Sequence, residues 1–256
     1  MMRYTIRYVS LLAGMLTVFS SCEHKDLCFD HEAHAPKSDV HVKAVYEKEW
    51  EHTCEGGPDW EQYPAWESRF GMEYHELCPD APDGLRVQVY NEDGTNNILN
   101  VAPEGDIVRM RPGEHSLLLY NNDTEYIVFD DMNSFASAKA TTRTRTRASY
   151  AGNPYMENTV ENTVNAPDML YGNYMENYTA ERKIEADELP VTMHPLVFTY
   201  LVRYEFSHGL EYVALARGAL AGMAGAVWLN SGRTSEEAAT ILLSLIHISE
   251  PTRQAE

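Results

Sequence analysis

The sequence is poor in positive charge. Its 256 residues include 20 Lys and Arg against 39 Asp and Glu, which gives a formal net charge of −19 at pH 7. A nucleic-acid-binding surface needs clustered Lys and Arg to neutralise phosphates, so we expect no nucleic-acid partner. The same shortage argues against a polybasic membrane patch. An acidic, self-repelling surface fits an extracytoplasmic location.

Motifs that organise common catalytic sites are also missing. The sequence has no glycine-rich phosphate loop, no Gly-x-Ser-x-Gly elbow and no His-Glu-x-x-His zinc helix. Carboxylates are frequent between residues 59 and 80, but nothing fixes a pair at the separation that a glycosidase needs. We therefore expect no enzyme activity, no catalytic residues and no cofactor.

Side chains of the types that bind zinc occur near the N-terminus, at His24, Cys28, His31 and His34. A structural zinc site needs a closed tetrahedral set, and this polar segment has no companion ligand pair. We interpret it as a tether over residues 22–37 and expect no metal.

Long apolar runs are scarce, and the N-terminal one, over residues 9–19, is shorter than the roughly 20 residues that span a membrane. It follows two arginines and precedes Ser20-Ser21-Cys22, which is the architecture of a secretory signal. The cysteine after the cut resembles that of a bacterial lipoprotein signal. We expect residues 1–21 to be the signal peptide and Cys22 to carry lipid that anchors the chain to the cell outer membrane. The alternative is a plain signal with an incidental cysteine, and the sequence leaves open a surface-exposed or a periplasm-facing orientation.

Cysteine is also rare, with four in the chain. Cys54 and Cys78 would close a loop of about 24 residues, which is worth about 3 kcal/mol on the loop-entropy account. Export permits such a bond. The alternatives are that Cys28 pairs with one of these two, or that all three thiols are free.

Short alternating segments bounded by turn residues predict an all-β fold. Leu85, Val87 and Val89 form one inward face, and the Asp93-Gly94 turn follows them. Repeats of strand and turn about every 8–12 residues favour β-sandwiches. Strands are expected at 40–48, 85–90, 98–101, 107–110, 115–120, 126–129, 196–206, 210–215 and 227–229, with a helical turn at 66–70.

Residues 134–188 break this pattern with an Arg/Thr run and two copies of Glu-Asn-Thr-Val. We interpret them as a low-complexity linker. The prediction is two tandem β-sandwich domains, over 38–133 and 189–242, joined by this irregular linker.

The last residues carry a different signal. Residues 243–253 (LSLIHISEPTR) resemble the in-frame translation of a sequencing-library adapter. We expect residues 243–256 to be an artefactual tail, which leaves the second sandwich truncated near Leu242.

Aromatic residues concentrate between positions 50 and 74, where Trp50, Trp60 and Trp66 accompany two tyrosines. They are candidates for stacking on a sugar ring or a peptide. A hydrophobic cluster under a long loop explains them equally, and we favour the cluster.

Five segments carry a family resemblance: 22–31 (CEHKDLCFDH), 112–121 (PGEHSLLLYN), 166–171 (APDMLY), 199–205 (TYLVRYE) and 217–225 (RGALAGMAG). Together they resemble a lipoprotein family of unknown function from Bacteroidetes-type bacteria, similar in layout to fimbrillin-type anchor and accessory subunits. The resemblance implies transthyretin-like sandwiches, an outer-membrane structural or adhesive role, and fimbrial partners bound by β-strand addition. The alternative is a glycan- or peptide-binding surface lipoprotein that uses the aromatic residues at 50–74.

Overall fold

The computed structural model describes residues 37–47, 66–77, 79–146, 162–200, 207–209 and 218–243. All of them belong to the compact unit Lys37–Glu256, and the chain's other unit is Met1–Pro36. The regular secondary structure of the described residues is almost entirely β-strand, with one five-residue helix, α3 (Trp66–Phe70), and one short 3-10 helix, η3 (Tyr74–Leu77). The predicted all-β class is confirmed.

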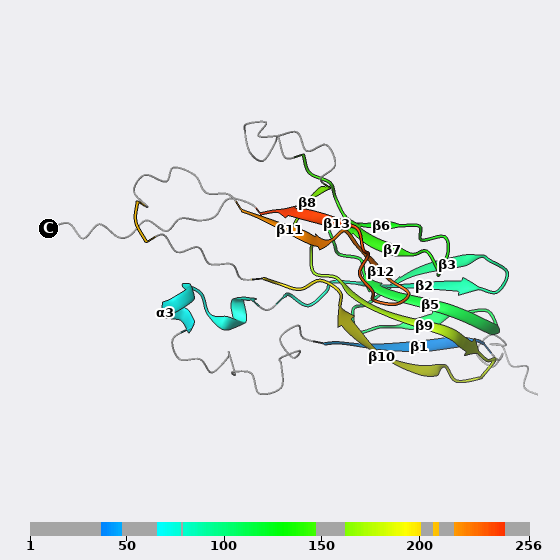
Figure 1. Cartoon of the computed structure of the whole chain (residues 1–256). Helices are drawn as coiled ribbons and strands as arrows, with labels where there is room; N and C mark the ends of the chain where they lie inside the picture. The colour runs from blue at the N-terminus through cyan, green and yellow to red at the C-terminus, as the bar shows by residue number, and fades with distance from the viewer. Residues whose placement is uncertain are drawn as a thin grey trace, which may run out of the picture. The chain divides into compact units, whose positions relative to one another are not determined.

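The largest sheet has seven strands: β1 (Asp39–Tyr46), β2 (Leu85–Asn91), β3 (Asn96–Val101), β4 (Ile107–Arg109), β5 (Gly113–Asn121), β9 (Tyr171–Ala180) and β10 (Asp187–Pro195). Their order is β3-β2-β5-β9-β10-β1-β4. Figure 1 shows β3, β2, β5 and β9 side by side. Neighbours are antiparallel except β1 and β10, which run parallel. The sheet therefore joins strands from distant parts of the chain.

Two smaller sheets complete the described fold: β12-β7-β6 and β11-β13-β8. Their strands are β6 (Ile127–Asp130), β7 (Lys139–Thr142), β8 (Thr163–Asn165), β11 (Ala219–Ala224), β12 (Ala226–Trp228) and β13 (Ala238–Leu242). Just past β7 the backbone bonds to β8, because Arg145 N–H donates to Thr163 O and Asn165 N–H donates to Arg143 O, at 2.8 and 3.0 Å. These bonds connect the two small sheets.

The core forms on both faces of β2 and β5, because successive side chains of a strand point to opposite faces. Leu85, Val87 and Val89 are at most 1% exposed, as the sequence predicted, and belong to an apolar cluster that includes residues of β1 and β10. Tyr90 and Tyr120 point to the other face and join a second cluster, with residues of β6, β7 and β12. These two strands are therefore buried from both sides.

The segment 134–188, expected to be an irregular linker, contains β7, β8 and β9. This corrects the sequence interpretation. Strand β9 includes Tyr171, Met175 and Tyr178, which belong to or pack against the core, and it lies between β5 and β10, which bond to its backbone from both sides. Pairing also crosses the expected domain boundaries, since β1 pairs with β10 and β7 with β12. The ranges 38–133 and 189–242 remain predictions for independently folding domains.

The strand expected at 196–206 is absent from its described part, residues 196–200. Strand β10 ends at Pro195, which has no N–H for a further ladder bond. Phe198 and Tyr200 beyond it are 51% and 63% exposed. Residues 201–206 and the expected strand at 210–215 lie outside the described residues.

Candidate functional site

An apolar groove of about 420 Å³ lies beside the small sheets. β7, β8, β11, β12 and β13 contribute to its walls, together with residues 196–200. The larger apolar side chains along it include Val164, Leu220, Met223 and Ile241. A groove of this kind suits the apolar side chains of an added polypeptide segment.

Small residues along β11 leave the groove open. The strand reads ALAGMA, and its register with β13 shifts between Leu220 and Met223. Gly222 has a φ of +76°, which glycine adopts without the steric cost that a Cβ would impose. The backbone at Gly225 passes close to the backbone at Glu237, since a Cβ built on Gly225 would stand 3.1 Å from Glu237 O. The glycines and alanines of this segment therefore shape this wall of the groove and leave it with few large side chains.

β11 lines the groove and is also an outer strand of its sheet. Among the described strands, β11 pairs with β13 on one side and with none on the other. Strand β8, at the far side of this sheet, is bonded by the chain that follows β7. An edge strand with an unpaired row of backbone N–H and C=O groups is a template for another strand.

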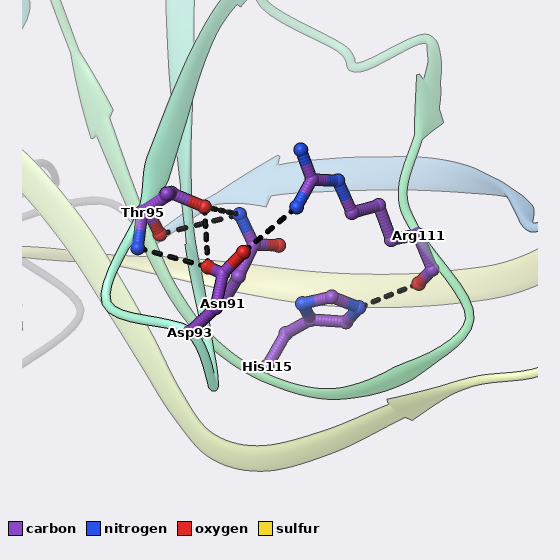
Figure 2. A network of polar contacts seen from close by, with 5 residues as sticks. All are labelled: Asn91, Asp93, Thr95, Arg111 and His115. Atoms are coloured by element: carbon purple, nitrogen blue, oxygen red, sulfur yellow. Dashed lines mark hydrogen bonds and ion pairs between the residues drawn. The ribbon is translucent and has the colours of Figure 1, made fainter.

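A polar network fastens the turn between β2 and β3, and Figure 2 shows Asp93 at its centre. The Asp93 carboxylate accepts hydrogen bonds from Thr95 N–H at 3.0 Å, Thr95 Oγ1 at 2.5 Å and Arg111 Nη1 at 2.9 Å. The bonds from Thr95, and then the charge of Arg111, lower the pKa of Asp93. Asn91 Nδ2 donates to Thr95 Oγ1 at 2.9 Å, and buried His115 donates from Nε2 to Arg111 O at 2.6 Å. The turn is thereby held in one conformation.

The described structure places one of the sequence-predicted site residues, Trp66. Its ring packs against Phe70 and Tyr74, with centroids 4.4 and 4.9 Å apart. This geometry agrees with the hydrophobic-cluster interpretation for Trp66. The other candidates, Cys22, Trp50, Cys54, Trp60 and Cys78, lie outside the described residues.

No group of three or more His, Cys, Asp or Glu among the described residues could hold a metal ion. No helix in that part of the chain has the length and apolar character to cross a membrane.

Sequence reasoning missed the groove, because its walls come from strands that are far apart in the chain. The signal that could have indicated one wall is the run of small residues around Gly222 and Gly225, which leaves little side-chain volume. The partners of that wall, such as Val164, become neighbours through the pairing of β8 with β13.

The chain belongs to the family described as a domain of unknown function, DUF5119, which residues 65–244 match. It is 27% identical over 178 residues to "Putative fimbrium anchoring subunit Fim4B" of Bacteroides ovatus, and this match covers 68% of the chain. The match covers 50% of that protein, so the chain spans about half the length of this curated relative.

The fold is similar to that of a crystal structure described as "a putative adhesin" from Bacteroides ovatus ATCC 8483. The TM-score is 0.51 at 20% identity, and the match covers 92% of this chain and 75% of that one. At this identity the likeness concerns the fold.

Proposed function

We propose that the protein is a fimbria-associated subunit of the cell surface, with a structural and adhesive role, tethered to the outer membrane by lipid on Cys22. The observation that carries the proposal is the 27% identity over 178 residues to a relative whose name refers to fimbrium anchoring. The all-β fold and the open apolar groove support it, because such features suit assembly by strand addition.

Attachment to the membrane rests on the signal architecture before Cys22. Each buried CH₂ of an acyl chain contributes about 0.8 kcal/mol to membrane binding. Lipid on Cys22 would therefore hold the tether at the membrane while the folded unit remains in water.

Attachment to the fimbria uses the outer edge of β11. An extended segment of a neighbouring fimbrial subunit lies along this edge and bonds to its backbone. Its alternate side chains point over the groove and contact Leu220, Met223 and Ile241. Hydrogen bonds along the edge supply affinity, and the apolar groove selects the side chains.

The experiment compares two substitutions on β11 in a bacterium that assembles the fimbria. Leu220→Asp places a charge in the groove, and Ala221→Asp places the same charge at an exposed neighbour that does not line it. The fimbrial subunit that co-purifies with the tagged protein from solubilised outer membranes is measured. We expect the fimbrial subunit to co-purify with Ala221→Asp but not with Leu220→Asp, while the two variants have equal melting temperatures. Equal recovery with both variants would contradict strand addition at this groove.

The alternative role in glycan or peptide binding has no support from Trp66, whose ring already packs on Phe70 and Tyr74. A glycan array with Trp66→Ala tests it directly. A loss of specific binding in that variant would favour the alternative.

A further inference from the structure

The outermost strand of the seven-stranded sheet, β3, has an open edge. It pairs with β2 in continuous register from Tyr90↔Asn96 to Leu85↔Val101. No strand among the described residues pairs with its other side. Alternate residues of this six-residue strand therefore direct their backbone N–H and C=O groups outward, towards a further strand.

The other outer strands of the described sheets lack a long edge that is both continuous and uncharged. β4 and β12 have three residues each, and β6 has four and ends in Asp130. β11, the edge beside the groove, is uncharged, but its register shift beside Gly222 divides it into two short stretches. Natural proteins protect sheet edges by short strands, bulges, charges and prolines. β3 (NNILNV) has no charged residue, no proline and no bulge, so it differs from the rest.

Both ends of β3 are fastened to the sheet. At its start, the network around Asp93 and Thr95 holds the turn that enters the strand (Figure 2). At its end, Asn100 Oδ1 accepts hydrogen bonds from Arg86 Nε at 2.8 Å and Asn122 Nδ2 at 3.0 Å. A rigid edge loses little conformational entropy on binding, which favours affinity.

The faces of β3 differ in what they offer a partner. Leu99 and Val101 pack against the core that includes β1 and β10. Ile98 points to the opposite face and is 53% exposed. A strand added at this edge would gain an apolar contact with Ile98 on the outer face.

Charge identifies the kind of partner. Glu92 precedes β3 and Glu104 follows it; both side chains are exposed, and no ion pair joins either to the described residues. A second copy paired antiparallel would bring Glu92 of one chain near Glu104 of the other, and a parallel copy would bring identical carboxylates together. The net charge of −19 adds to this repulsion. A strand with basic ends would be attracted instead.

We propose that the outer edge of β3 binds an extended segment of another protein, uncharged along about six residues and carrying Lys or Arg at both ends. Binding occurs by β-strand addition and extends the seven-stranded sheet by one strand. This site belongs to a different sheet from the groove at β11, so it goes beyond the proposed function and stands independently of it.

The probe is a synthetic peptide with capped ends, six alternating Thr and Val residues and two Lys at each end. A second peptide replaces the lysines with glutamates, and a third contains a central proline that breaks the ladder. Affinity for the mature chain is measured by fluorescence anisotropy at low salt. We expect the Lys peptide to bind and the other two to bind at least about tenfold more weakly. Hydrogen exchange should show new protection at the amides of β3.

A matched pair of variants locates the site. Ile98→Lys and Ile107→Lys change isoleucines of similar exposure, 53% and 52%, on the two outer strands of the same sheet. We expect Ile98→Lys to weaken binding of the Lys peptide about tenfold and Ile107→Lys to leave it unchanged. Leu220→Asp, in the groove, should also leave it unchanged. Thermal unfolding shows whether each variant is folded.

Three outcomes would overturn the proposal. One is equal binding of the Lys and Glu peptides. Another is protection that appears elsewhere than β3. The third is self-association of the mature chain in sedimentation that Ile98→Lys abolishes, because β3 would then pair with a second copy.

Discussion

Gly105 lies against the backbone carbonyl of Val42, so closely that a Cβ built on Gly105 would stand 2.1 Å from Val42 O. The φ of Gly105 is +102°, a backbone conformation in which a residue with a Cβ is strained. On either side of it, Glu104 O accepts a hydrogen bond from Ala44 N–H at 2.8 Å, and Asp106 O accepts one from Val42 N–H at 3.1 Å. The connection between β3 and β4 is thereby attached to β1.

Gly105→Ala should lower the free energy of unfolding by about 2–3 kcal/mol, because it adds both backbone strain and a clash. Urea unfolding followed by fluorescence measures the change. Gly94→Ala is the control, since Gly94 has a φ of +79° but no atom within 4 Å of the added Cβ. It should lose about 1 kcal/mol. Equal losses in the two variants would show that the contact with Val42 is unimportant.

Gln88 and Tyr90 belong to one polar cluster, and substitution of Gln88 should lower the free energy of unfolding more than substitution of Tyr90. It is 1% exposed, its Nε2 donates to Met132 O at 2.7 Å, and its Oε1 accepts from Tyr120 Oη at 3.2 Å. Gln88→Ala leaves a cavity and removes one hydrogen-bond partner of the Tyr120 hydroxyl, so we expect the free energy of unfolding to fall by about 2–4 kcal/mol. Tyr90→Phe removes a second hydrogen bond to the same Met132 oxygen and should cost about 1 kcal/mol. A larger loss of stability in Tyr90→Phe than in Gln88→Ala would contradict this prediction.

Stability at alkaline pH should depend on Tyr46. Burial, and then the nearby charges of Asp123 and Glu104, raise the pKa of Tyr46 from 10.0 to about 12. A raised pKa in the folded state means that the contribution is present below pH 10 and is lost as the pH rises towards 12. Tyr46→Phe should flatten this decline, as followed by urea titrations from pH 9 to about 12. The decline would have another origin if it were unchanged in the variant.

Stability at acid pH should depend on Asp93, whose pKa is lowered by hydrogen bonds from Thr95 and by the charge of Arg111. A lowered pKa in the folded state gives stability that is present above the unfolded value of 3.8 and is lost as the pH falls through the folded value. In Asp93→Asn this acid dependence should be weaker. Amide exchange at β3 in both proteins measures it locally, and identical pH profiles would contradict the role of Asp93.

Much of the sheet was predictable because its strands combine alternation with strong turn signals. Leu85, Val87 and Val89 alternate before the Asp93-Gly94 turn, and the structure buries all three on one face. Burial of the opposite face at Tyr90 was not predictable from this segment, because the layer that covers it comes from β6, β7 and β12.

Strands β9 and β10 were also not predicted from the sequence, for different reasons. Strand β9 mixes apolar and polar side chains without a strict alternation, and its place in the sheet depends on backbone hydrogen bonds to β5 and β10. In β10, Leu189, Val191 and Met193 alternate with exposed residues, which is a readable signal for a strand. The aromatic alternation beyond Pro195 was the stronger pattern in sequence, yet its described residues form no strand.

The proposed lipid on Cys22 would hold the protein at the outer membrane as a fimbria-associated subunit. The most direct test of this attachment is fractionation of cells that express the wild type, Cys22→Ala or Cys28→Ala, with quantification of the protein and of fimbriae in each fraction. We predict that Cys22→Ala leaves the outer membrane for the soluble fraction and that fimbriae are released with it, while Cys28→Ala behaves as the wild type. Retention of Cys22→Ala in the outer membrane at the wild-type level would contradict the account.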